Sequence, residues 1–240
     1  MSHASAAAPS LVLERMSPFQ WTAIAICVLL NMLDGFDAGE RALFASMLDR
    51  IAINLATAFA ASGWRCVLVD LDPQGNASTG LGLQQAQRVH SSYDLLLGDV
   101  SLEDAAIPTL IPNLDIVPAT VDLSGADIEL VEYEDRTGRL KAAFDKSDAH
   151  WDICLIDCPP SLGLITVNAL VAVDSLLVPL QCEFFALEGV SQITRTIERV
   201  SKSLNPNLKL GGIILTMFDK RNNLSELVAA DVRAFFDDKV

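Results

Sequence analysis

The chain has 240 residues, 51% of them hydrophobic, and a formal net charge of −14. This length and composition predict one sizeable core and argue against disorder. The negative charge excludes a protein that coats nucleic acid with its whole surface, because phosphate contacts need clustered lysine and arginine, so any DNA contact must be local.

The first forty residues differ from the rest of the chain. Residues 1–10 are small and polar, and residues 19–33 form an apolar run that ends at an acidic loop. The run is short for a membrane span and has no basic cluster before it, so we expect neither a transporter span nor a signal peptide. The run and its loop, at about residues 19–37, resemble the start of the first transmembrane helix of major-facilitator aromatic-acid symporters. A lone helix forms no transport path, and a chimeric or mis-joined reading frame explains the likeness better.

Beyond residue 40 the pattern changes to alternating helices and strands. Residues 40–61 have helical spacing and stop before Gly63, a residue that commonly ends helices. Residues 65–70 form a continuous apolar run, as expected of a strand buried on both faces. Similar runs predict strands at 114–117, 152–157, 175–180 and 210–217, and helices are expected at 135–146, 164–173, 187–204 and 224–238.

Strands that alternate with helices predict an α/β fold. We expect a doubly wound, mostly parallel sheet flanked by helices on both faces, with ligands at the carboxyl ends of the strands. One such domain is predicted over residues 41–240, after an atypical N-terminal segment at 1–40.

Polar residues follow the predicted strand at 65–70. The run VLVDLDPQGNAS places Asp70, Asp72 and Asn76 at and just beyond the strand end. Proline and glycine between them end the strand, so two carboxylates at its tip can face a ligand.

Another acidic residue ends the predicted strand at 152–157. In ICLIDCPPSLG, Asp157 stands at the carboxyl end, and Pro159 and Pro160 prevent the ladder from continuing. Phosphate-binding α/β proteins use such an aspartate to hold Mg²⁺, usually through water. Asp157 could equally cap the next turn. Acidic residues at two neighbouring strand ends favour the ligand interpretation.

Cysteine and histidine give little sign of a metal site. The cysteines lie in apolar runs without CxxC spacing, and no histidine has a cysteine or carboxylate at ligand spacing. We interpret the cysteines as small buried side chains in a reducing cytosol: Cys27, Cys66, Cys154, Cys158 and Cys182.

Four motifs carry a specific resemblance. They are DLDPQGNAS, IDCPPSLG with NAL shortly after, VPLQCEFFALEG, and LTMFDKR. In this order, over about residues 52–240, they resemble the ParA-type partition ATPases, a family with a deviant P-loop. The resemblance implies a P-loop NTPase-like fold, ATP and Mg²⁺ as cofactors, and a cytoplasmic, nucleoid-associated homodimer. It also implies non-specific DNA and a ParB-like centromere-binding protein as partners.

The resemblance also implies roles for individual residues at the nucleotide. Asp72 matches the family's catalytic aspartate, which orients the attacking water, and Asp157 matches the aspartate that supports Mg²⁺. Asp70 and Asn76 lie in the same nucleotide-binding motif. The VPAT stretch at 117–120 resembles a switch region.

Two further segments resemble surfaces of the family. QCEFFALEG resembles part of the dimer face. Arg221, next to Lys220, matches a basic residue implicated in non-specific DNA binding. Without the resemblance, these two charges would be interpreted as a solvated pair in a loop.

The family's phosphate-binding loop is not present in this chain. Counting back from AINLA at 52–56, the positions of KGGVGKTT fall on residues 43–50, which read LFASMLDR. No glycine remains to let backbone N–H groups approach phosphates, and Leu43 and Leu48 stand at the lysine positions. We therefore predict that the loop is replaced. The first strand, central in this fold, is missing too unless residues 23–30 take its place.

The family also continues beyond the equivalent of Val240 with a strand, a Pro-Arg-Asn stretch near the adenine and a terminal helix, so we expect a truncated C-terminus. The hypothesis is a ParA-like partition protein impaired in ATP binding. The first alternative is a non-catalytic binding module, which nucleotide binding would distinguish. A membrane-attached septum-placement relative and a transporter fragment are further alternatives with less support.

Overall fold

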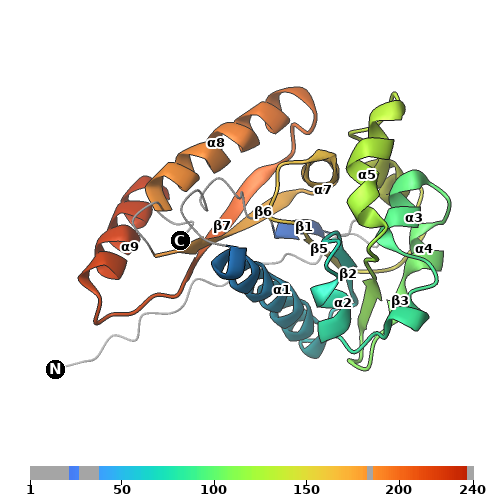
Figure 1. The fold of residues 1–240 in the computed structure, drawn as a ribbon, viewed down its shortest axis with the longest axis horizontal. Helices are drawn as coiled ribbons and strands as arrows, with labels where there is room; N and C mark the ends of the chain where they lie inside the picture. Colours follow the sequence, from blue (N-terminus) through green and yellow to red (C-terminus); the bar gives the residue numbers. More distant parts are fainter. Residues whose placement is uncertain (1–21, 27–37, 183–185, 237–240) are drawn as a thin grey trace.

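The computed structural model describes residues 22–26, 38–182 and 186–236. Within them a seven-stranded sheet runs in the order β3-β4-β2-β5-β1-β6-β7 (Figure 1). The strands are β1 (Thr22–Ile26), β2 (Cys66–Asp70), β3 (Ile107–Pro108), β4 (Leu114–Val117), β5 (Ile153–Asp157), β6 (Ser175–Gln181) and β7 (Lys209–Thr216).

All strand pairs of this sheet are parallel except β3 with β4. The predicted α/β class with a mostly parallel sheet is confirmed. β1 lies between β5 and β6 and pairs with both of them. Thus residues 22–26 of the apolar N-terminal run occupy the central position that the sequence left open, and the rest of that run lies outside the described residues.

Helices cover both faces of the sheet (Figure 1). In the described part of the chain they are α1 (Ala38–Ala61), α2 (Asn76–Gly80), α3 (Ser92–Leu97), α4 (Leu102–Ala105), α5 (Leu123–Glu129), α6 (Arg139–Asp145), α7 (Leu164–Ala172), α8 (Ala186–Ser203) and α9 (Asn223–Phe236). Short 3-10 turns lie at Gln85–Gln87 (η2) and Leu130–Glu132 (η3).

Alternate residues of β2 enter two different hydrophobic clusters. Cys66 and Leu68 pack with the alanines of α1, whereas Val67 and Val69 pack with the helices on the opposite side. This alternation is the two-residue period of a strand, and it explains why a strand buried on both faces reads as one continuous apolar run. Cysteines 66, 154, 158 and 182 are buried, as expected.

The end of α1 confirms the role predicted for Gly63. Its φ of +91° is left-handed, and its N–H donates to the Ala60 carbonyl at 3.0 Å. The Trp64 N–H reaches the Phe59 carbonyl at 3.2 Å, so the last carbonyls of the helix have donors. No helix in the described residues is long and apolar enough to cross a membrane.

A buried asparagine joins α6 to α7. The Asn168 Oδ1 accepts hydrogen bonds from the backbone N–H groups of Arg139 and Leu140, at 2.9 and 3.2 Å. Its Nδ2 donates to the carbonyls of Arg136 and Leu164, at 2.7 and 2.9 Å. The first turn of α6, whose N–H groups have no partners within the helix, is therefore capped by a side chain from α7.

We predict that Asn168→Leu lowers the free energy of unfolding by about 2–4 kcal/mol, because it leaves buried N–H and carbonyl groups without partners. Equilibrium urea denaturation measures this change. Asn207→Ala, at an exposed asparagine, is the control and should change stability little. Equal stability of the two variants would show that water satisfies these backbone groups instead.

Candidate carboxylate site at the strand ends

Two aspartates meet at the carboxyl edge of the sheet. Asp70 ends β2 and Asp157 ends β5, and the two residues are paired in the parallel register. Ile26 ends β1 on the other side of Asp157. The acidic residues predicted at neighbouring strand ends therefore do lie side by side, where ligands bind in open α/β sheets.

Asp70 is fully buried and its oxygens already have donors. Its Oδ1 accepts from the Asp72 N–H at 3.1 Å, and its Oδ2 accepts from the Ser78 N–H and Oγ at 2.9 and 2.6 Å. Burial raises the pKa of Asp70 to about 7, although these hydrogen bonds favour the ionised form. Asp70 therefore holds the start of α2 against β2, and its predicted role at a nucleotide stays a prediction.

Asp72 begins the turn that follows β2. Its Oδ1 accepts from the Gln74 N–H at 2.9 Å, and its carbonyl accepts from the Gly75 N–H at 2.9 Å. Gly75 has a φ of +60°, and a Cβ added there would collide with the Arg88 guanidinium. Both the backbone angle and the close approach thus require glycine in DPQGN. Burial raises the pKa of Asp72, and the Gln74 N–H opposes that rise.

The VPAT stretch is tied to this turn through Ala119. The Ala119 N–H donates to the Ser78 Oγ at 3.0 Å, and its carbonyl accepts from Arg88 at 2.9 Å. Arg88 also donates to the Thr79 Oγ1 and the Leu83 carbonyl, at 2.8 and 3.1 Å. A buried arginine and a buried serine therefore fix the predicted switch segment against α2.

Asp49, from α1, faces Asp157 across the same edge. It is 3% exposed, and the two side chains lie within hydrogen-bonding reach of each other. Among the described residues, no hydrogen-bond donor reaches either oxygen of Asp157 or Asp49 Oδ2. Two carboxylates can bond to each other only if one of them keeps a proton. The pKa values of both carboxyl groups are raised, which favours the protonated form in this pair, and Asn76 is a further partner of the Asp49 side chain.

Burial is the main cause of the high proton affinity at this edge. Burial, reinforced by Asp70 and Asp49, raises the pKa of Asp157 well above its ordinary value. Burial also raises the pKa of Asp49, and the bond to Asp157 opposes this rise. In the described residues, no group of three or more histidine, cysteine or acidic side chains is arranged to hold a metal ion.

The positions counted as the phosphate-binding loop are helical. Residues 43–50 all lie inside α1. An α-helix commits each N–H to the carbonyl four residues earlier, so these N–H groups cannot surround a phosphate. Leu48 is buried at a lysine position of the family motif, and Asp49 stands where a hydroxyl would bind Mg²⁺. The residues present do not fit a nucleoside triphosphate with Mg²⁺.

Lys220 and Arg221 lie in the loop between β7 and α9, and β7 is three positions from β5 in the sheet. The Arg221 side chain is 90% exposed, and its Nε and one terminal nitrogen bind Asp219 at 3.0 and 2.9 Å. The structure therefore brings Asp70, Asp72, Asn76 and Asp157 together, whereas the two basic residues follow the carboxyl end of β7, at the far side of the sheet order.

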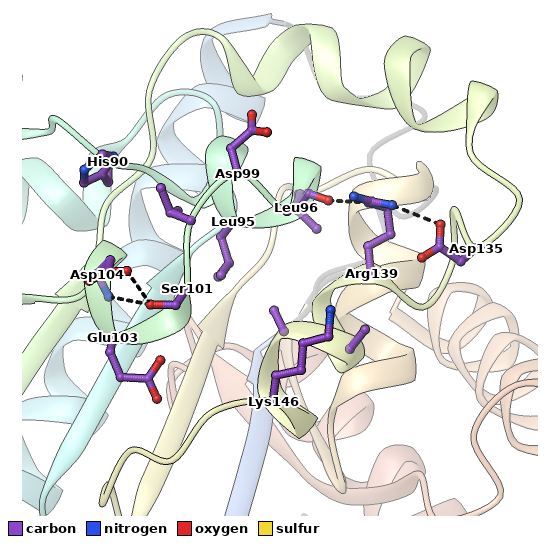
Figure 2. Close-up of a pocket in the computed structure, with 14 residues that line it drawn as sticks. His90, Leu95, Leu96, Asp99, Ser101, Glu103, Asp104, Asp135, Arg139 and Lys146 are labelled. Carbon is purple, nitrogen blue, oxygen red and sulfur yellow. Dashed lines mark hydrogen bonds and ion pairs between the residues drawn. The ribbon is translucent and has the colours of Figure 1, made fainter.

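A cavity of about 730 Å³ lies between α3, α4 and α6 (Figure 2). It holds none of the predicted site residues. Arg139, on its wall, already donates to the carbonyls of Leu96 and Leu97 and to Asp135. Its lining mixes acidic with basic side chains, so it offers no single charge to a ligand. We assign it no role.

The sequence analysis missed two residues of the carboxylate site. In the sequence, Asp49 stands at the position of a magnesium-binding hydroxyl of the family. Nothing in its spacing predicted that it would face Asp157. Ser78 gave no signal, because its importance comes from its contacts with Asp70 and Ala119.

We predict that Asp49→Asn stabilises the protein by about 1–2 kcal/mol at pH 8 and by less at pH 5. The folded protein holds protons that the unfolded chain releases above about pH 4, so wild-type stability falls as pH rises towards 7 and beyond. An amide removes one buried charge and can donate to Asp157. Urea denaturation across this pH range tests the prediction, with Glu226→Gln on the exposed face of α9 as the control. A variant that loses stability with pH as steeply as wild type would contradict the protonation of the Asp49 and Asp157 pair.

Comparison with known proteins supports one family throughout. The model of an AAA domain family matches residues 50–210. The chain is 56% identical to the chromosome partitioning protein ParA of Caulobacter vibrioides over 191 residues, which cover 79% of this chain and 72% of that protein. It is 47% identical to the sporulation initiation inhibitor protein Soj of Bacillus subtilis over 189 residues, covering 79% and 75%.

Solved structures agree with these relatives. A cobyrinic acid a,c-diamide synthase from Mycobacterium smegmatis with bound ADP and magnesium is 36% identical, with a TM-score of 0.77 over 91% of this chain and 83% of that one. A plasmid partition protein from Borrelia burgdorferi shares the fold at 21% identity, with a TM-score of 0.75 over 92% and 87%. With its fold, its strand-end aspartates and these relatives, the chain belongs to the ParA family of chromosome partitioning proteins.

Proposed function

We propose that this chain is a ParA-like partitioning protein that helps to segregate a chromosome or plasmid but is impaired in ATP binding. In this proposal it works in the cytoplasm at the nucleoid, with non-specific DNA and a ParB-like centromere-binding protein as partners, and as a homodimer. The sequence identity to ParA and Soj proteins supports the family activity.

The observation that carries the proposal is the placement of Asp70, Asp72 and Asp157. These residues, which match acidic positions of the family's motifs, lie together at the carboxyl edge of β2 and β5, where open α/β sheets bind their ligands. The altered part of the site is the phosphate-binding loop, which would neutralise the charge of the nucleotide. Phosphoryl transfer depends on neutralising the γ-phosphate charge, which backbone N–H groups, a lysine and Mg²⁺ provide in P-loop proteins.

The residues at the position of the phosphate-binding loop repel a nucleotide instead of attracting it. The helical residues 43–50 offer no free N–H groups, and Asp49 adds a carboxylate beside Asp157. Acidic groups without a cationic cradle repel a tetra-anionic triphosphate. If no nucleotide binds, the chain acts as the alternative, a non-catalytic binding module derived from a partition ATPase.

We predict that the chain neither binds ATP in the micromolar range nor hydrolyses it. Isothermal titration calorimetry with ATP and Mg²⁺ measures binding, and phosphate release measures hydrolysis. Replacing residues 43–50 by KGGVGKTT, with a β-strand directly before them, should restore binding, because the loop then supplies backbone N–H groups and a lysine at the end of a strand. Leu48→Lys alone is the matched control and should not restore it, because the helical N–H groups stay unavailable.

One outcome would contradict this argument. Micromolar ATP binding by the unchanged chain, lost in Asp157→Ala, would show that another segment holds the phosphates.

The proposed DNA contact is Arg221, with Lys220 beside it. The Asp219 carboxylate holds the Nε edge of the Arg221 guanidinium, and the pair lowers the pKa of Asp219. The other edge of the planar guanidinium has further N–H donors that can meet a phosphate. Surface ion pairs of this kind contribute little stability, so Arg221 can exchange partners at low cost.

We predict that Arg221→Ala weakens binding to all DNA sequences alike and lowers the slope of log affinity against log salt by about one. Fluorescence anisotropy with a labelled random duplex, from low to moderate salt, measures both. Because the chain carries a net charge of −14, the starting affinity should be low.

Arg65→Ala is the matched control for Arg221. Arg65 is also an exposed arginine in an ion pair, bound to Asp152 at 3.0 Å at the start of β2. The Arg65→Ala variant should leave the slope of log affinity against log salt unchanged. Equal losses of DNA affinity in the two variants would mean that only the total charge of the protein matters. Unchanged DNA affinity in Arg221→Ala would show that Arg221 is not part of the DNA contact.

The N-terminal segment carries a separate proposal. We infer that residues 1–40 are an atypical segment joined to a ParA-like domain at 41–240, and that residues 19–37 derive from a symporter-like helix. The genomic or transcript sequence across codons 35 to 55 tests this. An intact upstream P-loop in another reading frame would support it, and a continuous conserved frame would contradict it.

A further inference from the structure

One stretch of the chain contains no lysine or arginine. Residues 89–135 hold eleven acidic side chains: Asp94, Asp99, Glu103, Asp104, Asp115, Asp122, Asp127, Glu129, Glu132, Glu134 and Asp135. They lie in α3, α4, β4, α5, η3 and the segments that adjoin them, which gather at one end of the sheet, whereas α8 and α9 lie at the other (Figure 1). This end of the molecule is therefore strongly acidic.

The helix α5 has apolar residues on two faces. Leu123, Ala126 and Leu130 are fully buried and pack into the core. Val121 and Ile128 are 69% and 78% exposed, and Val131 is 55% exposed. We call Val121, Ile128 and Val131 the outer stripe.

Val121 lies in the turn before α5, Ile128 in α5 and Val131 in η3. Because Asp122, Glu129 and Leu130 continue the right-handed backbone at both ends of α5, spacings of seven and three residues bring the three side chains to the same side. Large apolar side chains gathered on a surface commonly mark a binding site. No described segment covers this stripe.

Acidic side chains follow one flank of the outer stripe. Asp122, Glu129 and Glu132 are exposed and lie about a quarter-turn of the helix from the apolar residues. The outer face of α5 and η3 thus has an apolar strip beside a row of carboxylates. A complementary partner needs an apolar strip beside a row of lysines or arginines, as in an amphipathic helix.

We propose that the outer face of α5 and η3 is a docking surface for a cationic amphipathic segment of a partner protein. A second copy of this chain is a poor occupant, because two such acidic faces would repel each other. Nucleic acid is repelled by the same carboxylates. The inference goes beyond the proposed DNA contact at Arg221 and does not depend on it.

The experiment uses three labelled 16-residue peptides as probes. The first has lysine and leucine at helical spacing, the second has the leucines replaced by serine, and the third has the lysines replaced by glutamate. Fluorescence anisotropy at physiological salt measures their dissociation constants with the full chain. We expect the lysine and leucine peptide to bind at least about ten-fold more tightly than either of the others, because only it matches both the strip and the charge.

Matched variants test where this peptide binds. Ile128→Ser with Val131→Ser should weaken its binding by at least about ten-fold, and Glu132→Gln by a few-fold. The controls are Leu227→Ser and Glu226→Gln on α9, which remove an exposed apolar residue and an acidic charge elsewhere. They should stay within about two-fold of wild type. All these positions are exposed, and circular dichroism checks that each variant is folded.

Three outcomes would overturn the proposal. Equal losses in the α5 and α9 variants would mean general attraction to an acidic protein. Equal binding of the lysine–serine and lysine–leucine peptides would mean that the outer stripe makes no contact. A change of oligomeric state in Ile128→Ser with Val131→Ser would make a second copy the occupant. The DNA assay on Arg221 is unaffected by these results, so the two proposals can fail separately.

Discussion

Asp157 ends a central strand beneath the surface of the protein, with no donor for either of its oxygens. A buried carboxylate in this state is costly unless it is neutralised by a proton, a cation or a set of hydrogen bonds. Its strand neighbour Asp70 has the hydrogen bonds, from Ser78 and the Asp72 N–H. Asp157 has Asp49 beside it instead, and burial raises its pKa well above the ordinary value, so the neutral form of this acid is favoured at the edge where the fold places ligands.

The strands and the meeting of their acidic ends could be predicted from the sequence. Continuous apolar runs bounded by Asp, Pro and Gly marked β2 and β5 to within a residue, because both faces of these strands are buried. The central position of β1 could not be predicted, because a short apolar run is compatible with a strand or a helix. The Asp49–Asp157 contact was also hidden, since α1 and β5 are distant in sequence and no pattern links them.

The acidic charge of the molecule is concentrated at one end. The acidic residues of α3 to η3 lie at one end of the sheet, where residues 89–135 hold no lysine or arginine. At the opposite end, α8, β7, α9 and their connections hold seven basic and five acidic residues. The charge of that end is therefore nearly balanced, and a cationic protein is drawn to the other end of the molecule. The net charge alone conceals this arrangement.

The position of β1 also bears on how the protein acquires its structure. β1 is early in the chain, but its partners β5 and β6 follow much later. During synthesis this strand emerges first and must wait, with its backbone groups exposed, until β5 has left the ribosome. Parallel pairing across such a distance is slow and leaves apolar segments unprotected in the meantime. Because its central strand is short and is synthesised long before its partners, we expect this chain to bind chaperones while it folds.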